Sequence, residues 1–350
     1  MKILVLNAGS SSLKYKLFSM NNMIVMAEGV IENISEGAHH DAILEVERRL
    51  GSVGLDSLAE LDGVGHRVVH GGEEFTSSTI VDERVISAIK SLIPLAPLHN
   101  PANLDGILIC KKQAAGVPQV AAFDTAFHQS IPEHAYMYAL PYEEYEQSAV
   151  RRYGFHGTSH LFVAKEAAKS LGKQLCDVNL ITLHLGNGAS VCAIKNGKSI
   201  DTSMGMTPLE GLMMGTRSGD IDPAILFYLS RERGYDTAQL DDMLNKKSGL
   251  LGICGENDMR QIHKMIAEGH SKAKLAHDMF CYRICKYIGS YAAVLGKVDA
   301  IIFTGGIGEN DAITRDAISN AIQLDIPFMT IKTDEELEIA LQTKEMIDKV

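Results

Sequence analysis

Short apolar runs that end in turns rich in Gly, Asn and Ser recur along the chain. Residues 3–6 are continuously apolar, as expected of a strand buried on both faces, and residues 13–17 alternate between apolar and polar positions. A turn at 7–12 separates them. The same plan returns roughly 180 residues later, with an apolar run at 180–185, a turn at 186–190 and a second strand at 191–194. The repeat predicts two related lobes.

The remaining segments predict helices and further strands. Helices are expected around 41–50, 83–92 and 102–114, and strands within 61–72 and over 117–123. Asn196-Gly197 is a strong hairpin signal after the strand at 191–194. A third apolar run, 300–304, leads into a Gly-rich turn at 305–310 and a helix over about 311–322. The chain is therefore expected to be an α/β protein, with a lobe boundary near 125–150.

Composition and charge narrow the class of protein. Of the 350 residues, 46% are hydrophobic and 22% charged, as in soluble globular proteins, and no run approaches the ~18 apolar residues of a membrane-spanning helix. The formal net charge of -11 argues against general nucleic-acid binding. The six cysteines show no CxxC spacing, so reduced thiols are the simplest interpretation. We expect a cytoplasmic protein with no nucleic-acid or membrane partner.

The Gly-rich turns are candidates for phosphate binding, because exposed backbone N–H groups with little side chain around them attract anions. An isolated turn of this kind is more often an ordinary hairpin, but three of them follow apolar strands here. The standard nucleotide motifs fail. A Walker loop ending at Ser199 would need glycine at Cys192, and G-x-G-x-x-G patterns meet Val191 and Asp311 in their last place.

Several polar residues sit where chemistry is expected. Arg67 lies in an apolar strand-like stretch and should meet an anion, either an internal carboxylate or a substrate. Arg217 lies in a polar loop, where a solvated role is the alternative. Asp124 follows the carboxyl end of a predicted strand, and either a ligand site or a helix cap suits that position. For His156 and His160, capping and hydrogen bonding are favoured over zinc.

These segments resemble the acetate kinase family. The signature-like blocks are Val5–Lys14 and Asp201–Gly211, joined by His66–Gly72, Ala96–Asn100, Phe123–His128, Tyr153–His160, His184–Gly188, Met214–Pro223 and Phe303–Asn310. The resemblance covers nearly the whole chain. It implies a two-lobed, duplicated actin-like ATPase (ribonuclease H-like) fold with the active site in the interlobe cleft. The expected lobes are 1–126, with 337–350 able to pack back on it, and a nucleotide-binding lobe at 127–336.

The resemblance also implies roles for individual residues. The metal would be held by Asn7 and Glu335, with Glu336 as the alternative. The catalytic positions would be Asp124, Arg67, Arg217, His156 and His99, and the substrate would contact Arg67, Val69, Leu98, Phe155 and Pro208. ATP would be bound by Ser10, Ser12, Lys14, His184, Leu185, Gly186, Asn187, Gly188, Asp258, Met259, Arg260, Gly306, Ile307, Gly308, Glu309 and Asn310.

The activity implied is reversible, Mg²⁺-dependent transfer of the ATP γ-phosphate to acetate, giving acetyl phosphate and ADP by direct in-line transfer, with Mn²⁺ as an alternative metal. A homodimer is implied as well. Propionate or butyrate kinase differs mainly in pocket volume, whereas an actin-like or chaperone-like ATP-driven switch would lack a carboxylate-specific arginine pair. Family members are usually several tens of residues longer, and the shortening falls at about 31–60 and 324–334.

Overall fold

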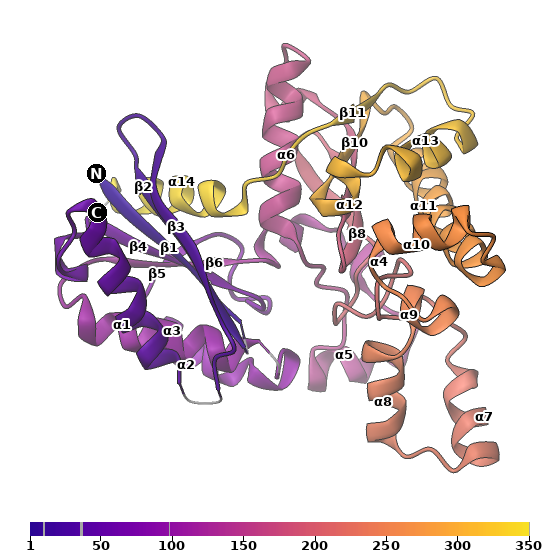
Figure 1. The fold of residues 1–350 in the computed structure, drawn as a ribbon, viewed down its shortest axis with the longest axis horizontal. Helices are drawn as coiled ribbons and strands as arrows, with labels where there is room; N and C mark the ends of the chain where they lie inside the picture. The colour runs from indigo at the N-terminus through magenta and orange to yellow at the C-terminus, as the bar shows by residue number, and fades with distance from the viewer. Residues whose placement is uncertain (10, 36–37, 98, 350) are drawn as a thin grey trace. The chain divides into compact units, whose positions relative to one another are not determined.

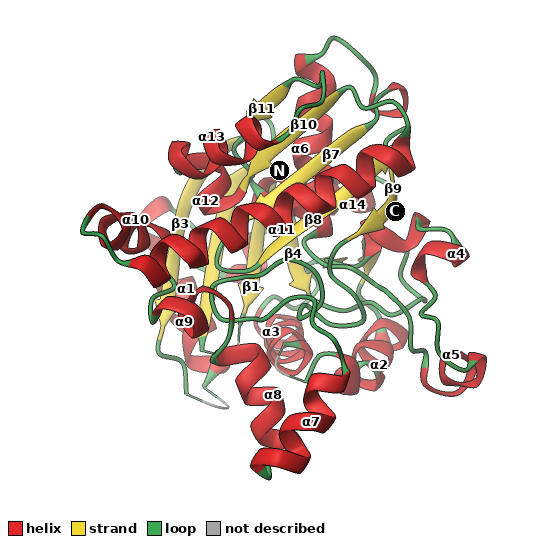
Figure 2. Ribbon diagram, turned by 90° about the vertical axis from the view of Figure 1, so that its right-hand side faces the viewer, coloured by secondary structure: helices red, strands yellow, loops and turns green. Residues whose placement is uncertain are grey.

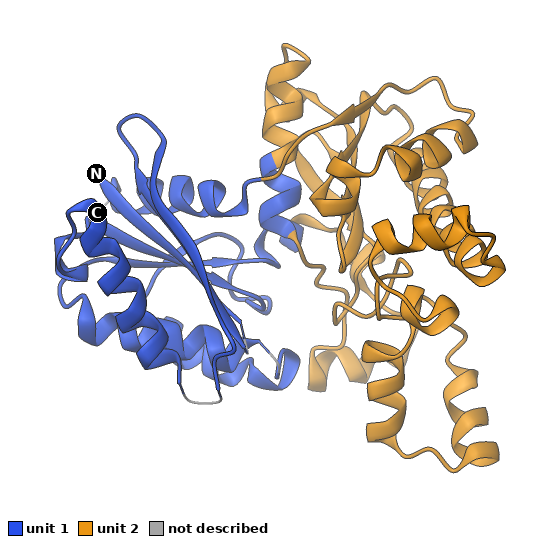
Figure 3. Ribbon diagram, in the orientation of Figure 1, with its two compact units in different colours: residues 1–129, 157–162, 334–350 blue, residues 130–156, 163–333 orange. Residues whose placement is uncertain are grey.

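Residues 1–9, 11–35, 38–97 and 99–349 are described by a computed structural model. The chain divides into two compact units, shown in blue and orange in Figure 3. Unit 1 comprises residues 1–129, 157–162 and 334–350, and unit 2 comprises residues 130–156 and 163–333. Within the described residues, no helix is long and apolar enough to cross a membrane.

Unit 1 is built on a mixed six-stranded sheet with the order β3-β2-β1-β4-β6-β5. Its strands are β1 (Lys2–Ala8), β2 (Ser12–Ser19), β3 (Ile24–Glu32), β4 (Gly63–Val68), β5 (Thr79–Ile80) and β6 (Gln119–Phe123). β1 is antiparallel to β2 and parallel to β4, which is parallel to β6. The carboxyl ends of β1, β4 and β6 therefore meet at one edge, where open α/β sheets place their ligands.

Helices cover both faces of this sheet (Figure 1). On one face, Leu4 and Leu6 of β1 share a core with α1 (His39–Leu50) and α3 (Asn100–Gln113), beside α2 (Glu83–Ser91). On the other face, Ile3 and Val5 pack against Ile339 of α14 (Glu335–Ile347). The continuous apolar run of β1 is explained by this burial on both sides, as predicted. Three short 3-10 helices, Gly51–Val53, Leu58–Glu60 and Ile93–Leu95, lie in the connections.

Unit 2 repeats the central arrangement in a five-stranded sheet of order β11-β10-β7-β8-β9. Its strands are β7 (Leu180–Leu185), β8 (Ala189–Lys195), β9 (Lys198–Thr202), β10 (Ala300–Thr304) and β11 (Phe328–Thr330). As in unit 1, a central strand pairs with an antiparallel hairpin partner on one side and a parallel strand on the other. The strand–turn–strand repeat read from the sequence is confirmed.

The longest helix of unit 2, α11 (Ser271–Leu295), lies across this sheet (Figure 2). α11 packs against β8 and also against α9 (Gly249–Cys254), α10 (Met259–Ala267) and α13 (Ala312–Ala321). The other helices are α4 (Glu133–Tyr136), α5 (Tyr142–Ser148), α7 (Ala224–Arg233), α8 (Thr237–Lys246), α12 (Gly305–Asn310) and the 3-10 helix Leu175–Asp177. The chain passes between the units at the 3-10 helix Ala126–Ser130, at the start of and within α6 (Gly157–Ser170), and again at Thr333–Asp334 before α14.

Two local features differ from the sequence prediction. The Gly-rich stretch 305–310 was expected to be a turn, but it forms the short helix α12. Gly305 adopts a positive φ of 78° at its start, and its N–H donates to Oε1 of Glu309, 3.0 Å away. The edge strand β3 was not predicted, because several of its apolar residues are exposed and give no burial pattern. Predictions of the other helices and strands named above agree with the structure within a few residues.

A buried histidine in β4 gives unit 1 an acid-sensitive point. His66 is 3% exposed, its Nε2 lies 2.7 Å from the side-chain amide of Gln119, and burial lowers its pKa to about 4. The folded protein therefore holds His66 neutral, whereas the unfolded chain takes up a proton below its ordinary value of 6.5. The contribution of neutral His66 to the free energy of unfolding is therefore fully present above pH 6.5 and is lost as the pH falls from 6.5 towards 4.

We expect His66→Gln to flatten this dependence by about one proton, or roughly 1.4 kcal/mol per pH unit between pH 6 and 4.5. The measurement is the unfolding free energy by urea titration at several pH values. His40→Gln, at a histidine whose side chain is 53% exposed, is the matched control and should keep the wild-type slope. Equal slopes for wild type and His66→Gln would contradict the assignment.

Candidate active site

Unit 1 gathers four polar side chains at the carboxyl edge of its sheet. Asn7 lies near the end of β1, Arg67 lies in β4, Asp124 directly follows β6, and Glu335 begins α14. The guanidinium of Arg67 donates to both oxygens of Asp124, with Nη2 2.6 Å from Oδ2 and Nε 3.0 Å from Oδ1. Nη1 lies 3.4 Å from Oδ1 of Asn7, and Nε lies 4.0 Å from Oε2 of Glu335.

These contacts decide between the alternatives that the sequence left open. Arg67 meets an internal carboxylate, and that carboxylate is Asp124, which is 1% exposed. The Asp124 side chain faces this guanidinium, while its backbone carbonyl accepts the N–H of Gly157. The pairing leaves a negative surplus at the edge, because Glu335 stands beside an arginine already engaged by Asp124.

The electrostatics follow from this crowding. Burial raises the pKa of Glu335 to about 7, and the charges of Asp124 and Glu336 add to the effect against the opposing pull of Arg67. Burial works against the charge of Arg67, but Asp124 and Glu335 outweigh it and raise its pKa. Because the ionised form of Glu335 is disfavoured here, a nearby cation would stabilise it strongly.

The neighbouring carboxylate, Glu336, is already paired. Nζ of Lys16 lies 3.4 Å from Oε2 of Glu336 and 3.2 Å from Oδ1 of Asp334, so this lysine binds acidic residues on both sides of Glu335. Burial lowers the pKa of Lys16, but the charges of Glu336 and Asp334 outweigh it, and the net shift is upward. Glu335 thus faces Arg67, while Glu336 faces Lys16.

The first Gly-rich turn joins β1 to β2 beside this cluster. The N–H of Gly9 donates to the carbonyl of Ser12, 2.8 Å away, and the carbonyl of Gly9 lies 2.8 Å from Nε2 of His39. Ser12 is half-buried and Lys14 is exposed, on the face of β2 predicted from the alternation. Ser10, predicted to bind phosphate, lies outside the described residues.

The residues predicted to form the substrate pocket belong to both units. In unit 1, Val69 is 8% exposed just after β4, and His99 is half-buried at the start of α3. Leu98 lies outside the described residues. In unit 2, Phe155 is 2% exposed and Pro208 is half-buried. Each unit therefore carries apolar residues of the predicted methyl pocket.

Unit 2 holds a second cluster, built from two histidines and an arginine. The rings of His156 and His184 stack with centroids 4.2 Å apart, and Nδ1 of His156 lies 2.9 Å from Oγ of Ser190. His156 adopts a positive φ of 58°, a strained conformation for a residue other than glycine that is typical of functional positions. A Cβ on Gly188 would lie 3.4 Å from Nη1 of Arg217 and 3.6 Å from Cε1 of His156. His156, His184, Gly188 and Arg217 are therefore neighbours.

Arg217 differs from Arg67 in having no acidic partner among the described residues. Its Nη1 donates to the carbonyl of Pro208, 3.2 Å away, and lies 3.6 Å from the sulfur of Met214. Within the described ranges, no ion pair joins it to a carboxylate. Burial lowers its pKa, as expected for a guanidinium removed from water without a counter-charge. An arginine in this state is suited to bind an anion from outside the chain.

A glycine lets the Arg217 loop approach the second Gly-rich turn. The N–H of Gly215 donates to the carbonyl of Asn187, 3.0 Å away. A Cβ on Gly215 would stand 1.8 Å from Oδ1 of Asn187, so any side chain there would push the two loops apart. Within the turn itself, the N–H of Gly186 donates to the carbonyl of Gly188. The Arg217 loop is thus held close to the turn at 186–190.

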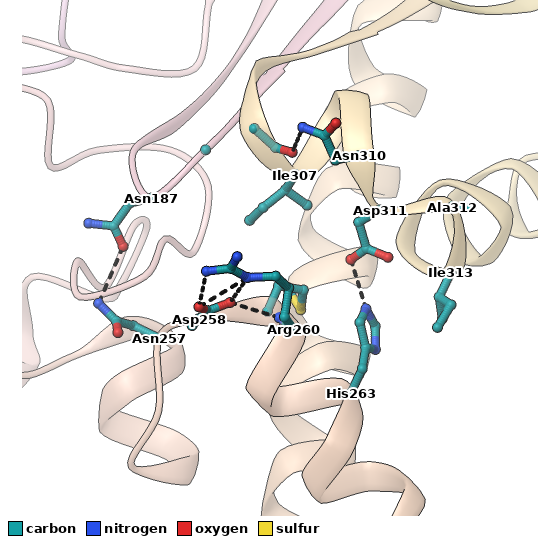
Figure 4. A pocket seen from close by; sticks show the side chains of 13 residues that line it. Asn187, Asn257, Asp258, Arg260, His263, Ile307, Asn310, Asp311, Ala312 and Ile313 are labelled. Atoms are coloured by element: carbon teal, nitrogen blue, oxygen red, sulfur yellow. Dashed lines mark hydrogen bonds and ion pairs between the residues drawn. The ribbon is translucent and has the colours of Figure 1, made fainter. Parts of the chain in front are cut away.

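A cavity of about 810 Å³ opens beside this turn (Figure 4). It is lined by Gly186, Asn187, Asn257, Asp258, Met259, Arg260, His263, Gly306, Ile307, Asn310, Asp311, Ala312 and Ile313. Eight of these were predicted to bind the nucleotide, and three segments far apart in sequence supply them, as a cofactor site of this kind requires. Asn257, His263, Asp311, Ala312 and Ile313 were not predicted, although all lie next to predicted segments.

Two predicted residues near the cavity have another role in this structure. The side chain of Glu309 turns back, and its Oε1 accepts from the N–H of Gly305 and of Thr333, each 3.0 Å away. Gly308 packs against β7 and β10, with an imagined Cβ 3.5 Å from the carbonyl carbon of Phe303. Neither residue lines the cavity, so in this structure both support the conformation of α12 without contacting the cavity.

Comparisons with known proteins agree with this arrangement. The family model of the acetokinase family matches residues 35–349. An acetate kinase of Campylobacter concisus is 49% identical over 99% of both chains, in an alignment of 394 positions that leaves gaps in this shorter chain. The alignment length agrees with a chain several tens of residues shorter than this relative, and the placement of the shortening at about 31–60 and 324–334 stays a prediction.

Solved structures lead to the same family. A Porphyromonas gingivalis acetate kinase superposes with a TM-score of 0.93 at 42% identity, and a Francisella tularensis propionate kinase does so with the same values, each over 99% of both chains. A hexokinase of Thermus thermophilus from the ROK family, with a TM-score of 0.53 at 11% identity, shares the fold alone. The fold is that of the actin-like ATPases, and the chain belongs to the acetokinase family.

Proposed function

We propose that this protein is an acetate kinase, which transfers the γ-phosphate of ATP reversibly to acetate and forms acetyl phosphate and ADP. One observation supports this most strongly: among the residues that the structure describes, the guanidinium of Arg217 has no acidic partner, and it lies beside His156, His184 and a Gly-rich turn that lines the cavity. The family and its named relatives supply the identity of the substrates.

The chemistry asks little of a base. An acetate oxygen is already ionised at neutral pH, so it attacks the γ-phosphorus directly, the bond from that phosphorus to the β–γ bridging oxygen breaks, and ADP leaves with the electron pair. The obstacle is repulsion between two anions, which the enzyme overcomes by alignment and charge neutralisation. Arg217 and His156 act on the transferred phosphoryl group, while Arg67, aligned by Asp124, acts on the carboxylate side. Asp124 is thus a positioning residue rather than a base.

The polar edge of unit 1 fits a magnesium ion. The amide oxygen of Asn7 and the carboxylate of Glu335 are hard oxygen ligands, and the negative surplus there favours a cation. The described residues contain no cluster of three or more His, Cys, Asp or Glu suited to a metal. One or two protein oxygens plus substrate phosphates are the usual Mg²⁺ arrangement in kinases. When bound, Mg²⁺, or Mn²⁺ in its place, neutralises phosphate charge.

Two isosteric variants separate the candidate metal ligands. We expect Glu335→Gln to raise the Mg²⁺ concentration needed for half-maximal activity by at least about tenfold, because one charged ligand is lost. Glu336→Gln removes a partner of Lys16 instead and should leave the Mg²⁺ requirement within about twofold, since that carboxylate is already paired with Lys16. Mn²⁺ binding followed by electron paramagnetic resonance provides a readout independent of turnover. The reverse order of effects would assign the metal to Glu336.

Acetate is favoured over longer acids by the apolar residues available. Val69 leaves a small pocket, and one methylene changes discrimination by only ~1–3 kcal/mol, so some propionate use is expected. The similarity to a propionate kinase structure at the same identity makes propionate the second candidate. Rates with acetate, propionate and butyrate, measured by trapping the acyl phosphate with hydroxylamine, rank the three. The highest kcat/KM is expected for acetate.

The same assay tests the activity against the alternative of an ATP-driven binding switch. Acetate, ATP and Mg²⁺ together should yield trapped acetyl hydroxamate, and ATP hydrolysis without acetate should be slow. Slow ATP hydrolysis whose rate does not depend on acetate, with no trapped product, would favour a switch. A cytoplasmic location and a homodimer complete the proposal, the latter measurable by sedimentation.

A further inference from the structure

A hydrogen bond between a histidine and an aspartate joins two walls of the unit 2 cavity. Nε2 of His263, on α10, lies 2.7 Å from Oδ2 of Asp311, between α12 and α13 (Figure 4). Both residues line the cavity, and their side chains are only 17% and 13% exposed. One wall carries Asp258 and Arg260 at the start of α10, and the other carries Gly306 and Asn310 of α12. The pair therefore links two of the segments that are predicted from the sequence to bind ATP.

Asp311 is held rigidly on its own side. Its backbone N–H donates to the carbonyl of Ile307, 2.9 Å away, and its Oδ1 accepts from the N–H of Thr314, 3.2 Å away, which caps the start of α13. The hydroxyl of Thr314 also bonds Oδ2. A carboxylate fixed by the backbone of two helices offers His263 a single, well-defined position.

His263 is fixed from the opposite side. Its ring meets the ring of His277 edge-on at 5.1 Å, and Nε2 of His277 lies 3.2 Å from the hydroxyl of Thr314. α10 and α13 each pack against α11, which carries His277. The contact of His263 with Asp311 therefore links two helices that also share α11 as a neighbour. Within the part of the chain that the structure describes, no other ion pair links α10 with residues 305–321.

We propose that His263 and Asp311 form a positioning pair that sets nucleotide affinity by fixing the spacing of the two cavity walls. This inference rests on the proposed function. The pair does not touch the reacting phosphoryl group; it holds the walls in their binding geometry before ATP or ADP arrives. Without it, ordering α10 against α12 and α13 becomes a cost of binding, and affinity falls while phosphoryl transfer in the bound state continues.

The test compares ADP binding by calorimetry with the kinetics of full-length variants. His263→Leu should weaken ADP binding about tenfold and raise KM for ATP similarly, with KM for acetate and kcat nearly unchanged, since it loses a hydrogen bond to a charged group. His263→Gln keeps an N–H donor and should recover most of the affinity. His270→Leu, at the exposed histidine before α11, is the matched control and should bind ADP as wild type does.

Asp311→Ser gives the same test if His263→Leu does not fold, because serine keeps the cap of α13 but cannot reach His263. Unchanged ADP affinity in His263→Leu and Asp311→Ser would overturn the pair's role. So would equal losses in ATP KM, acetate KM and kcat, or failure of His263→Gln to restore affinity. Wild-type protein that does not bind ADP at all would instead overturn the proposed function.

Discussion

Arg217→Ala is expected to lower kcat by at least about 100-fold, the scale found for losing one donor aimed at transition-state charge. Arg217 has no acidic partner among the described residues, so its guanidinium is reserved for the transferred phosphate. The same feature makes it a burden on the fold. Because its charge is desolvated without compensation, the alanine variant should be no less stable than wild type.

The measurements are kcat from the trapped acyl phosphate and the urea midpoint. Arg217→Lys serves as the control, since it keeps a positive charge but not the planar fork, and we expect it to recover only part of the rate. Wild-type turnover in Arg217→Ala would show that this arginine does not act on the phosphate. A fall in both rate and stability would make it a structural residue.

Arg67→Ala is expected to have two large effects. It should lower kcat at least about 100-fold, because the carboxylate side loses its donor. It should also lower the unfolding free energy by about 3–5 kcal/mol, because Asp124, 1% exposed, is left as a buried charge without its partner and close to Glu335. The two arginines thus differ in what their loss does to stability.

A double variant separates these effects. Arg67→Ala with Asp124→Asn removes both charges, so most of the lost stability should return while the rate stays low. Urea unfolding gives the first quantity and acyl phosphate formation the second. Recovery of the rate together with the stability would mean that Arg67 contributes only to folding. Unaltered stability in the single variant would contradict the buried pair.

Local sequence patterns were sufficient for the parts of the site that lie at strand ends. Arg67 lies in β4 and Asp124 directly follows the adjacent parallel strand β6, so the α/β pattern places both residues at the carboxyl ends of strands, although it does not name them as partners. The turn at 186–190 is equally local. These features depend on periodicity and turn chemistry, which the sequence states directly.

The contacts that refine the site are not local, and no pattern announces them. Lys16 binds Asp334 across 318 positions and also pairs with Glu336, and this second contact distinguishes Glu336 from Glu335. His263 meets Asp311 across 48 positions, and neither residue stands in a recognisable motif. The helix α12 was taken for a turn, because glycines favour turns by propensity while the side chain of Glu309 stabilises the helix start. Tertiary packing decided each case.

The central claim is that one phosphoryl transfer is served by Arg67 of unit 1 and Arg217 of unit 2. A crystal structure with ADP, Mg²⁺, aluminium fluoride and acetate tests it most directly, because the fluoride group mimics the phosphoryl group in transfer. We predict that Arg217 donates to the fluoride group and that Arg67 approaches the acetate carboxylate, with ADP in the cavity of unit 2. Either guanidinium directed away from the bound ligands would contradict the account.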